Sequence, residues 1–394
     1  MQIGIVGKPN TGKSTLFNAI TEKEIEAANY PFTTIEPNKG VAFASTECPC
    51  RELDVTCDPN NSHCIEGTRY VPINVLDIAG LVPGASEGKG MGNEFLDSIR
   101  EANALIHVID AAGNTNKEGE PSENYNPVKD VEFIEEEFTE WMFNLFTENW
   151  KSNVKKFRTQ DNKLDEFLAK RFSGLGITKQ QVRKVLRKVE LPEKLREWED
   201  EKIHDFVERL RKESKPMIFA ANKADLPGAE ENIDRLREAF PEKTFVPTSA
   251  AAELSLRNAA EKGKIQYNPG DSDFEAVEEL SEKQENGLEK IRENVLEKYG
   301  STGIQELVNR AVFDLLDMIV VYPVEDTTKY SDQKGNVLPD AVLVEKGATP
   351  PELAYTIHSD IGDSYTKAVD AKTGRSLGKN YELEEGDIVK IFTN

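Results

Sequence analysis

The residues with the clearest chemical purpose are the eight from Gly7 to Ser14, which read Gly-Lys-Pro-Asn-Thr-Gly-Lys-Ser. They fit the GxxxxGKS pattern of a phosphate-binding loop, in which backbone N–H groups surround an anion at the N-terminus of a helix. There Lys13 reaches the β- and γ-phosphates, and the Ser14 hydroxyl coordinates Mg²⁺. A glycine turn that fits the pattern by chance is the alternative. The expected nucleotide contacts are Asn10, Thr11, Gly12, Lys13, Ser14 and Thr15.

A second motif, Asp77-Ile78-Ala79-Gly80, follows a strand-like run at 69–76. The Asp77 carboxylate would hold a Mg²⁺-bound water, and the Gly80 N–H would meet the γ-phosphate. The DxxG pattern is weak alone, but it is strong at a strand end downstream of a phosphate loop. The glycine-rich residues 81–92 that follow suit a segment that orders only when a γ-phosphate is present.

Residues 29–38 (Asn-Tyr-Pro-Phe-Thr-Thr-Ile-Glu-Pro-Asn) are polar and contain two prolines, which predicts a loop. They lie where GTPases have their first switch. In that switch a threonine gives its hydroxyl to Mg²⁺ and its backbone N–H to the γ-phosphate, so its position depends on the nucleotide. A threonine that only caps or stabilises a turn is the alternative.

Two later loops have the residues that read a guanine base, and each directly follows an apolar run typical of a buried strand. In the loop Asn-Lys-Ala-Asp, the carboxylate of Asp225 would accept hydrogen bonds from guanine N1–H and the exocyclic amine. Lys223 would lie along the base, and Asn222 would tie this loop to the phosphate loop. In the other loop, after Ser249, the Ala250 N–H would donate to guanine O6.

The four cysteines of the chain gather in one short stretch, at Cys48, Cys50, Cys57 and Cys64, with His63 beside the last. A C-x-C pair with two further cysteines nearby can close a tetrahedral Zn²⁺ or iron–sulfur site. The spacing is not that of a standard zinc motif, so redox-sensitive thiols and unliganded cysteines packed under a hairpin remain alternatives. Stable disulfides are not expected in a reducing cytosol.

The strands and helices that position these motifs predict an α/β fold, a P-loop NTPase domain of the Ras-like type with a helical insertion and a C-terminal β-grasp domain. The interval before the strand at 216–221 is too long for one crossover helix and has helix-spaced apolar residues. His107 lies inside an apolar run and is expected in the core. The predicted segments are the G domain at 1–115 and 216–270, the insertion at 116–215, a helical linker at 271–317 and the β-grasp domain at 318–394.

The charge balance is acidic, with 71 Asp plus Glu against 49 Lys plus Arg and a net charge of −22. Such a surface argues against unspecific affinity for nucleic-acid phosphates. The first predicted strand begins at residue 2, which leaves no room for a signal peptide, and no apolar run reaches the length of a membrane span. We therefore expect a cytoplasmic protein that does not bind membranes.

The strings at 7–15, 29–34 and 77–88 resemble those of Obg-related translation-factor GTPases, and more narrowly the archaeal relatives of the YchF branch. The resemblance covers essentially the whole chain, because that branch has a helical insertion and ends in a TGS domain of ubiquitin-like fold. It implies that Ser14 and Thr34 ligate Mg²⁺, that Asn10 positions K⁺ near the phosphates, and that the partners are the ribosome or RNA. The implied catalytic residues are Lys13, Thr34 and Gly80.

Two features of the sequence shape the functional prediction. Much of the YchF branch has a degenerate base-recognition motif and prefers ATP, whereas the motif at 222–225 is intact here, which predicts GTP. Leu81 stands where Ras-like enzymes have a water-positioning glutamine, and the family shares that apolar residue. The resemblance therefore implies slow hydrolysis that K⁺ or a partner raises. An ATPase and a GTP-gated scaffold with little hydrolysis are the alternatives.

Overall fold

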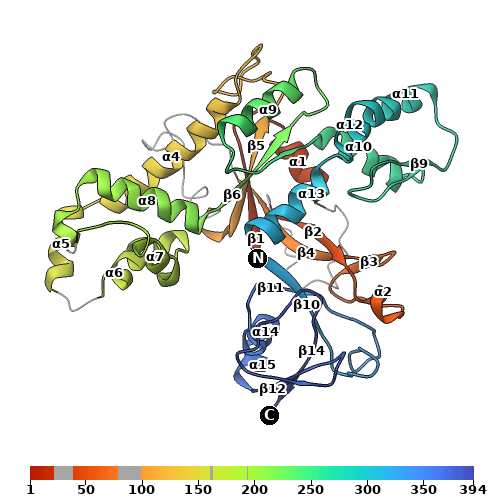
Figure 1. Ribbon diagram of the computed structural model, residues 1–394. Coiled ribbons are helices and arrows are strands. Elements are labelled where there is room, and N and C mark those ends of the chain that lie inside the picture. The colour runs from red at the N-terminus through yellow and green to blue at the C-terminus, as the bar shows by residue number, and fades with distance from the viewer. Residues whose placement is uncertain (22–38, 79–98, 160–162, 193) are drawn as a thin grey trace. The chain divides into compact units, whose positions relative to one another are not determined.

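The computed structural model describes residues 1–21, 39–78, 99–159, 163–192 and 194–394 (Figure 1). Two predicted nucleotide ligands, Thr34 and Gly80, lie outside these ranges. Contacts divide the chain into two units, and each unit combines two chain segments. The first unit consists of Met1–Ala19 and Val75–Leu307, and the second consists of Ile20–Asn74 and Val308–Asn394.

The first unit is built on parallel strands, β1 (Gln2–Val6), β5 (Ala104–Asp110), β6 (Met217–Asn222) and β7 (Phe245–Pro247), in the order β1-β5-β6-β7. Strand β4 (Thr68–Asp77) contributes its last residues beside β1, where the Ile78 N–H donates to Ile5 O at 3.0 Å. Every residue of β5 is buried. A parallel sheet covered on both faces needs such continuous apolar strands, and its loops meet at the carboxyl edge.

Helices follow the strands of this sheet (Figure 1). Helix α1 (Lys13–Ile20) comes after β1, α9 (Ala229–Ala239) after β6 and α10 (Ala250–Glu261) after β7. The side chain of Ser249 caps the last of these by accepting from the Ala252 N–H. The loops after β1, β6 and β7 therefore lead into the first turn of a helix, where backbone N–H groups are unpaired.

Between β5 and β6 the chain forms a group of helices, namely α4 (Val128–Thr147), α5 (Trp150–Thr159), α6 (Leu164–Arg171), α7 (Lys179–Leu186) and α8 (Asp200–Ser214). Their buried faces share one apolar cluster. The rings of Phe146 and Phe172 stack with centroids 5.0 Å apart, and Phe206 packs beside them. The aromatic residues that recur at helical spacing in the sequence thus supply the core of these helices.

Residues 265–307 pack on α10 rather than extending away from it. They include β8 (Ile265–Gln266), β9 (Glu275–Ala276), α11 (Glu282–Ile291), a π-helical turn (Arg292–Leu296), α12 (Glu297–Tyr299) and the start of α13 (Ile304–Asn309). Leu256 of α10 shares a buried cluster with Tyr267, Phe274 and Leu288. This part of the predicted linker is therefore a packed element of the first unit.

The second unit begins with β2 (Lys39–Glu47), the short helix α2 (Cys50–Leu53), β3 (His63–Ile65) and the first residues of β4. Strands β3 and β4 form an antiparallel hairpin, and β2 lies on the other side of β4. The hairpin turn uses Glu66 and Gly67, both with positive φ, of 48° and 80°. That geometry is typical of a two-residue hairpin turn.

The C-terminal part of the second unit is a five-stranded sheet with one principal helix. Its elements are β10 (Met318–Pro323), β11 (Val342–Glu345), α14 (Pro350–Ile357), α15 (Ser359–Asp363), β12 (Tyr365–Asp370), β13 (Ser376–Leu377) and β14 (Ile388–Thr393). The strand order is β11-β10-β14-β12-β13, with β10 parallel to β14. Helix α14 begins with a capping box of Thr349 and Glu352 and with Pro350 in its first turn. The predicted β-grasp fold is confirmed.

The two chain segments of the second unit are joined by hydrogen bonds and by a shared apolar cluster. The Asp58 N–H donates to Val337 O at 2.8 Å, and the Asn60 N–H donates to Pro339 O at 2.6 Å. The cluster includes Cys48 and Val71 from the first segment and Val320, Tyr322 and Leu338 from the second. The residues around β3 therefore cannot bury their apolar side chains without the C-terminal sheet.

Among the described residues, no helix combines the length and the apolar composition needed to cross a bilayer.

Candidate nucleotide-binding site

The phosphate loop runs from the end of β1 at Val6 to the start of α1 at Lys13. Asn10 and Gly12 have left-handed backbone conformations, with φ of 64° and 93°. A Cβ atom at position 12 would lie 2.3 Å from Asn222 Nδ2. Glycine is thus required at this position by both the backbone angle and the close approach of Asn222.

Lys13, the first residue of α1, forms an ion pair with Asp77, the last residue of β4. The Lys13 Nζ atom lies 2.8 Å from Asp77 Oδ1, and the two side chains are 16% and 17% exposed. The oxygen atoms of Ser14 and Asp77 are hard donors of the kind that Mg²⁺ binds, so the residues fit this ion. When bound, Mg²⁺ supplies neutralising charge to the β- and γ-phosphates. Lys13 can then exchange its carboxylate partner for a phosphate oxygen.

Asn222, the last residue of β6, connects three loops through its amide group. Its Nδ2 donates to Thr11 O at 2.9 Å, and its Oδ1 accepts from the Ala250 N–H at 3.1 Å. The side chain is buried, so these contacts are shielded from water. The Ala250 N–H, which the sequence suggests as a donor to guanine O6, has a partner within the protein, and that suggested role stays a prediction.

The base-recognition loop is fixed at both of its charged residues. Ser249 Oγ donates to Asp225 Oδ1 at 2.7 Å. Lys223, with φ of 64°, donates through Nζ to Asn10 O at 2.8 Å and pairs with Asp110 Oδ2 at 2.8 Å. The stem of Lys223 thus spans from this loop to the phosphate loop, and its predicted place along a bound base stays a prediction.

Asp110 is a site residue that sequence reasoning missed. It ends β5, its side chain has no exposed surface, and besides Lys223 it accepts from Thr115 Oγ1 at 3.0 Å. A buried carboxylate at the carboxyl end of a central parallel strand is a signal for a site residue, since such strand ends line the ligand crevice. Asp110 stands directly after an apolar run, so that signal is present in the sequence.

A second residue that sequence reasoning missed is Lys8, inside the phosphate loop. Its Nζ lies 2.8 Å from Asp130 Oδ2, and both side chains are 5% exposed. The same ammonium donates to Thr115 O at 2.9 Å and lies 4.1 Å from the centroid of the Tyr125 ring. Burial lowers the pKa of Lys8 and raises the pKa of Asp130, and their mutual attraction offsets this effect only in part. A buried ion pair therefore joins the phosphate loop to α4.

The segment after β5 also contacts the phosphate loop through its backbone. Asn10 Nδ2 donates to Gly119 O at 2.9 Å. Gly119 has φ of 83°, and a Cβ atom there would lie 2.6 Å from Pro9 O. Residues 113–121 thus lie directly against the loop, with Thr115 bridged to Pro121. Asn10 is the residue that the family resemblance relates to K⁺, and its amide orientation is set by this contact.

Residues 299–303 form hydrogen bonds with the loop at Ser249 and with the base-recognition loop. The Ser249 N–H donates to Thr302 O at 3.0 Å, and Tyr299 Oη donates to Ala224 O at 3.3 Å. Gly303 has φ of 76°, and any side chain there would clash with the backbone of Pro247 at the end of β7. The residues beyond α10 therefore hold the base-recognition loops in place, which local sequence patterns do not indicate.

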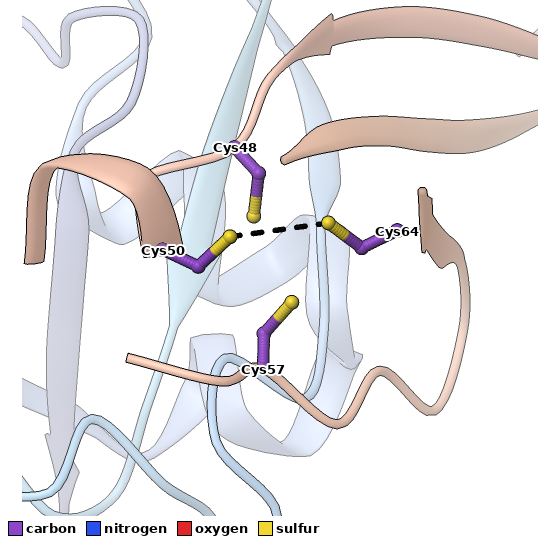
Figure 2. A group of neighbouring side chains, drawn as sticks. All are labelled: Cys48, Cys50, Cys57 and Cys64. Atoms are coloured by element: carbon purple, nitrogen blue, oxygen red, sulfur yellow. Dashed lines mark hydrogen bonds between the residues drawn. The ribbon is translucent and has the colours of Figure 1, made fainter. Parts of the chain in front are cut away.

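The four cysteines lie in the second unit, and Figure 2 shows their side chains directed toward one another. All four Sγ atoms lie within 4.8 Å of one another, and Cys50 Sγ and Cys64 Sγ are 3.9 Å apart. Burial raises the pKa of the Cys50 thiol to about 11. Burial acts in the same direction on Cys48, but the Cys50 N–H and the Arg69 guanidinium outweigh it and lower the pKa of Cys48. The pKa values of these two thiols are thus shifted in opposite directions.

A parallel sheet whose first strand leads into a GxxxxGKS loop, with base-recognition loops after later strands, defines a P-loop NTPase of the GTPase class. Residues 2–142 match the family of 50S ribosome-binding GTPases. Residues 220–326 match the G4 motif-containing domain of YGR210-like Obg-like GTPases, and residues 333–393 match the TGS domain. The matched ranges include the phosphate loop, the base-recognition motif and most of the C-terminal domain.

Whole-chain relatives agree with these matches. A GTP-binding protein of Methanocaldococcus jannaschii is 49% identical over 99% of this chain and 98% of its own. The ribosome-binding ATPase YchF of Bacillus subtilis is 30% identical over 99% of this chain and 98% of its own. The crystal structure of a GTP-binding protein from Pyrococcus horikoshii has a TM-score of 0.81 and 39% identity, with 100% of both chains covered. The chain belongs to the YchF-like branch of the Obg GTPase family, whose members include proteins named as ATPases.

Proposed function

We propose that this protein binds GTP in preference to ATP, hydrolyses it slowly in the presence of Mg²⁺ and K⁺, and acts as a regulatory switch on the ribosome or another RNA partner. The observation that carries the proposal is the intact Asn-Lys-Ala-Asp loop, with Asp225 and Lys223 both held by hydrogen bonds from neighbouring loops. The product of such a cycle is a conformational state rather than a metabolite.

The preference for guanine follows from the donors that each base presents. Guanine offers two adjacent N–H donors that one carboxylate accepts together, whereas adenine has an unprotonated N1 and a C–H there. Ser249 Oγ already donates to Asp225 Oδ1, which fixes the orientation of the carboxylate. Adenine would leave the carboxylate without the two donors of the base, at a cost on the order of 3–5 kcal/mol, or about 10²- to 10⁴-fold in affinity.

The proposed slow hydrolysis of GTP and the proposed ribosomal partner are supported by different observations. Leu81 offers no side-chain group to orient an attacking water, and the resemblance assigns the Asn10 side chain to K⁺. The Bacillus subtilis relative is named a ribosome-binding ATPase, and the family matched by residues 2–142 is described as ribosome-binding. Both names support a ribosomal partner for this chain.

The test is a competition between nucleotides on the parent protein and on Asp225→Asn. The parent should bind GTP at least about 10²-fold more tightly than ATP. The variant replaces an acceptor by an amide donor that faces the guanine amine but suits the C2 carbonyl of xanthine. Its affinity for GTP should therefore fall by the same factor, and its affinity for xanthosine triphosphate should rise. Asp234→Asn, an exposed substitution on α9 at 67% exposure, is the matched control and should leave both affinities unchanged.

The ATPase alternative has support of its own, because the 30% identical relative is named an ATPase. Equal affinity of the parent for ATP and GTP, or an Asp225→Asn variant that keeps its GTP affinity, would favour that alternative. Phosphate release measured in K⁺ with and without ribosomes separates either enzyme from a scaffold that binds GTP without hydrolysing it.

A further inference from the structure

The four thiols of the second unit converge from separate local elements (Figure 2). Cys48 directly follows β2, Cys50 begins α2, Cys57 lies in the loop after α2, and Cys64 is in β3. In a tetrahedral Zn²⁺ site with Zn–S bonds of about 2.3 Å, neighbouring sulfur atoms are about 3.8 Å apart. The Cys50–Cys64 separation of 3.9 Å and the 4.8 Å limit on all pairs are near this geometry. His63 is not part of the group of converging ligand atoms, and its ring stacks on Tyr70 with centroids 4.8 Å apart.

A buried positive charge beside the thiols gives an independent indication of negative charge at this place. The Arg69 side chain has no exposed surface and donates to Ser62 Oγ at 2.8 Å and to Leu338 O at 2.9 Å. Its Nε atom has no hydrogen-bond partner, and among the described residues no carboxylate forms an ion pair with it. Arg69 attracts the Asp340 carboxylate, but the two residues form no ion pair. A buried guanidinium without a paired carboxylate is costly, so an anionic group is expected in contact with it.

A second buried donor lies in the same cluster. The hydroxyl group of Tyr322 is buried and has no hydrogen-bond partner, and its ring lies 5.3 Å from the Arg69 guanidinium carbon. Tyr322 shares the apolar cluster with Cys48 and Cys50. Unpaired buried donors of this kind are rare in proteins, and they point to an acceptor that neutral thiols supply only weakly.

We propose that Cys48, Cys50, Cys57 and Cys64 bind one structural Zn²⁺ ion. Binding replaces the four thiol protons, which pass to the solvent, and leaves a site with a net charge of −2 that Arg69 partly balances. Four protein ligands leave no open position for water or substrate, so the ion is structural rather than catalytic. A Cys50–Cys64 disulfide would leave two thiols unused and the charge of Arg69 unbalanced.

The location of the site indicates which part of the fold the ion would stabilise. The cluster that contains Cys48 and Cys50 also contains Val320 and Leu338 of the C-terminal part. The ion would fix the loop between α2 and β3, whose backbone N–H groups at Asp58 and Asn60 pair with the same C-terminal segment. Zinc would therefore stabilise the attachment of residues 48–65 to the C-terminal sheet.

The experiment uses the full chain, purified with a reductant and without chelator. Elemental analysis should find about one Zn²⁺ per chain, and a thiol reagent should modify the cysteines only after a chelator is added. Cobalt substituted for zinc should give the absorption bands of a tetrahedral tetrathiolate site. The variants Cys57→Ser and Cys64→Ser should each lose most of the metal. The control Val324→Ala removes a buried side chain of the same cluster but no ligand, and it should retain zinc.

The measurements on the parent protein decide the matter even if a cysteine variant fails to fold. Parent protein that contains no zinc or cobalt after incubation with either metal, and whose four thiols react at once, would overturn the proposal. Recovery of a Cys50–Cys64 disulfide in peptides from protein purified under air without reductant, together with failure to bind metal after reduction, would overturn it in favour of a redox pair.

Discussion

The ion pair between Lys8 and Asp130 allows a quantitative test of how the phosphate loop is held. Changing Asp130 to Asn removes the counter-charge while keeping the shape and a hydrogen-bonding group. Both side chains are 5% exposed, so water cannot replace the lost partner. Breaking a buried pair in this way costs about 3–5 kcal/mol.

The free energy of deprotonating Lys8 gives a similar value for the loss of stability. The buried lysine can avoid an unpaired charge by losing its proton, and doing so at pH 7.5 from an ordinary pKa of 10.5 costs about 4 kcal/mol. The Asp130→Asn variant should therefore unfold at a lower urea concentration, with a loss of about 3–5 kcal/mol at pH 7.5. Part of that loss should be recovered as the pH rises toward 10, because deprotonation of Lys8 then costs less.

The assay is urea unfolding of the parent, Asp130→Asn, Lys8→Met and the double variant. The double variant should be more stable than Asp130→Asn alone, because no uncompensated charge remains. GTP affinity should fall in both single variants, since Lys8 belongs to the phosphate loop. Asp205→Asn is the matched control. It breaks an exposed pair with Arg209, with side chains 42% and 51% exposed, and should cost less than about 1 kcal/mol.

Two results would refute this reasoning. A loss below about 1 kcal/mol for Asp130→Asn would mean that water or another group replaces the carboxylate, as it does at exposed pairs. A double variant no more stable than the single one would mean that the loss comes from packing rather than from charge.

Three further predictions concern the site and the core. Lys13→Ala should weaken GTP binding about 10- to 150-fold, the value of one charge-assisted hydrogen bond at 1.5–3 kcal/mol, and should abolish hydrolysis; hydrolysis at the parental rate would contradict the phosphate-loop role. Replacing K⁺ by Na⁺ should slow the parent but not Asn10→Ala, and equal parental rates in both salts would exclude the K⁺ role. Burial lowers the pKa of His107 to about 3, so the unfolded chain binds a proton below about pH 6.5 that the folded chain does not. Stability should therefore fall between pH 7 and pH 5 by about 2 kcal/mol more in the parent than in His107→Leu, as measured by urea unfolding.

The positions of the nucleotide-binding motifs could be predicted from the sequence, but the contacts that hold these motifs in place could not. A phosphate loop between an apolar strand and a helix is a local pattern, so the position of Lys13 at the start of α1 and of Asn222 at the end of β6 could be predicted. The pairing of Lys8 with Asp130 joins residues 122 positions apart. No local spacing reports such a contact, because it depends on where α4 packs.

The same limit applies to the residues around the base-recognition loop. The stretch after α10 is charged and helical in sequence, which suggests a linker. In the structure Thr302 and Tyr299 hydrogen-bond to the loops that carry Ser249 and Asp225. Only the pairing of distant segments shows that these residues position the site, and the need for glycine at position 303 becomes clear only from that close approach.

The interleaved construction of the second unit has a consequence for biogenesis. The ribosome synthesises a chain from its N-terminus, so β2, β3 and the start of β4 emerge long before the strands on which they pack. Arg69 can donate its hydrogen bond to Leu338 O only after Leu338, 269 positions later, has been synthesised. During that interval the apolar side chains around Val71 have no partner, and the nascent chain exposes surface of the kind that chaperones bind. A protein truncated before β10 would remain in that condition permanently, so removal of the C-terminal domain should produce an aggregation-prone protein rather than an isolated, well-folded G domain.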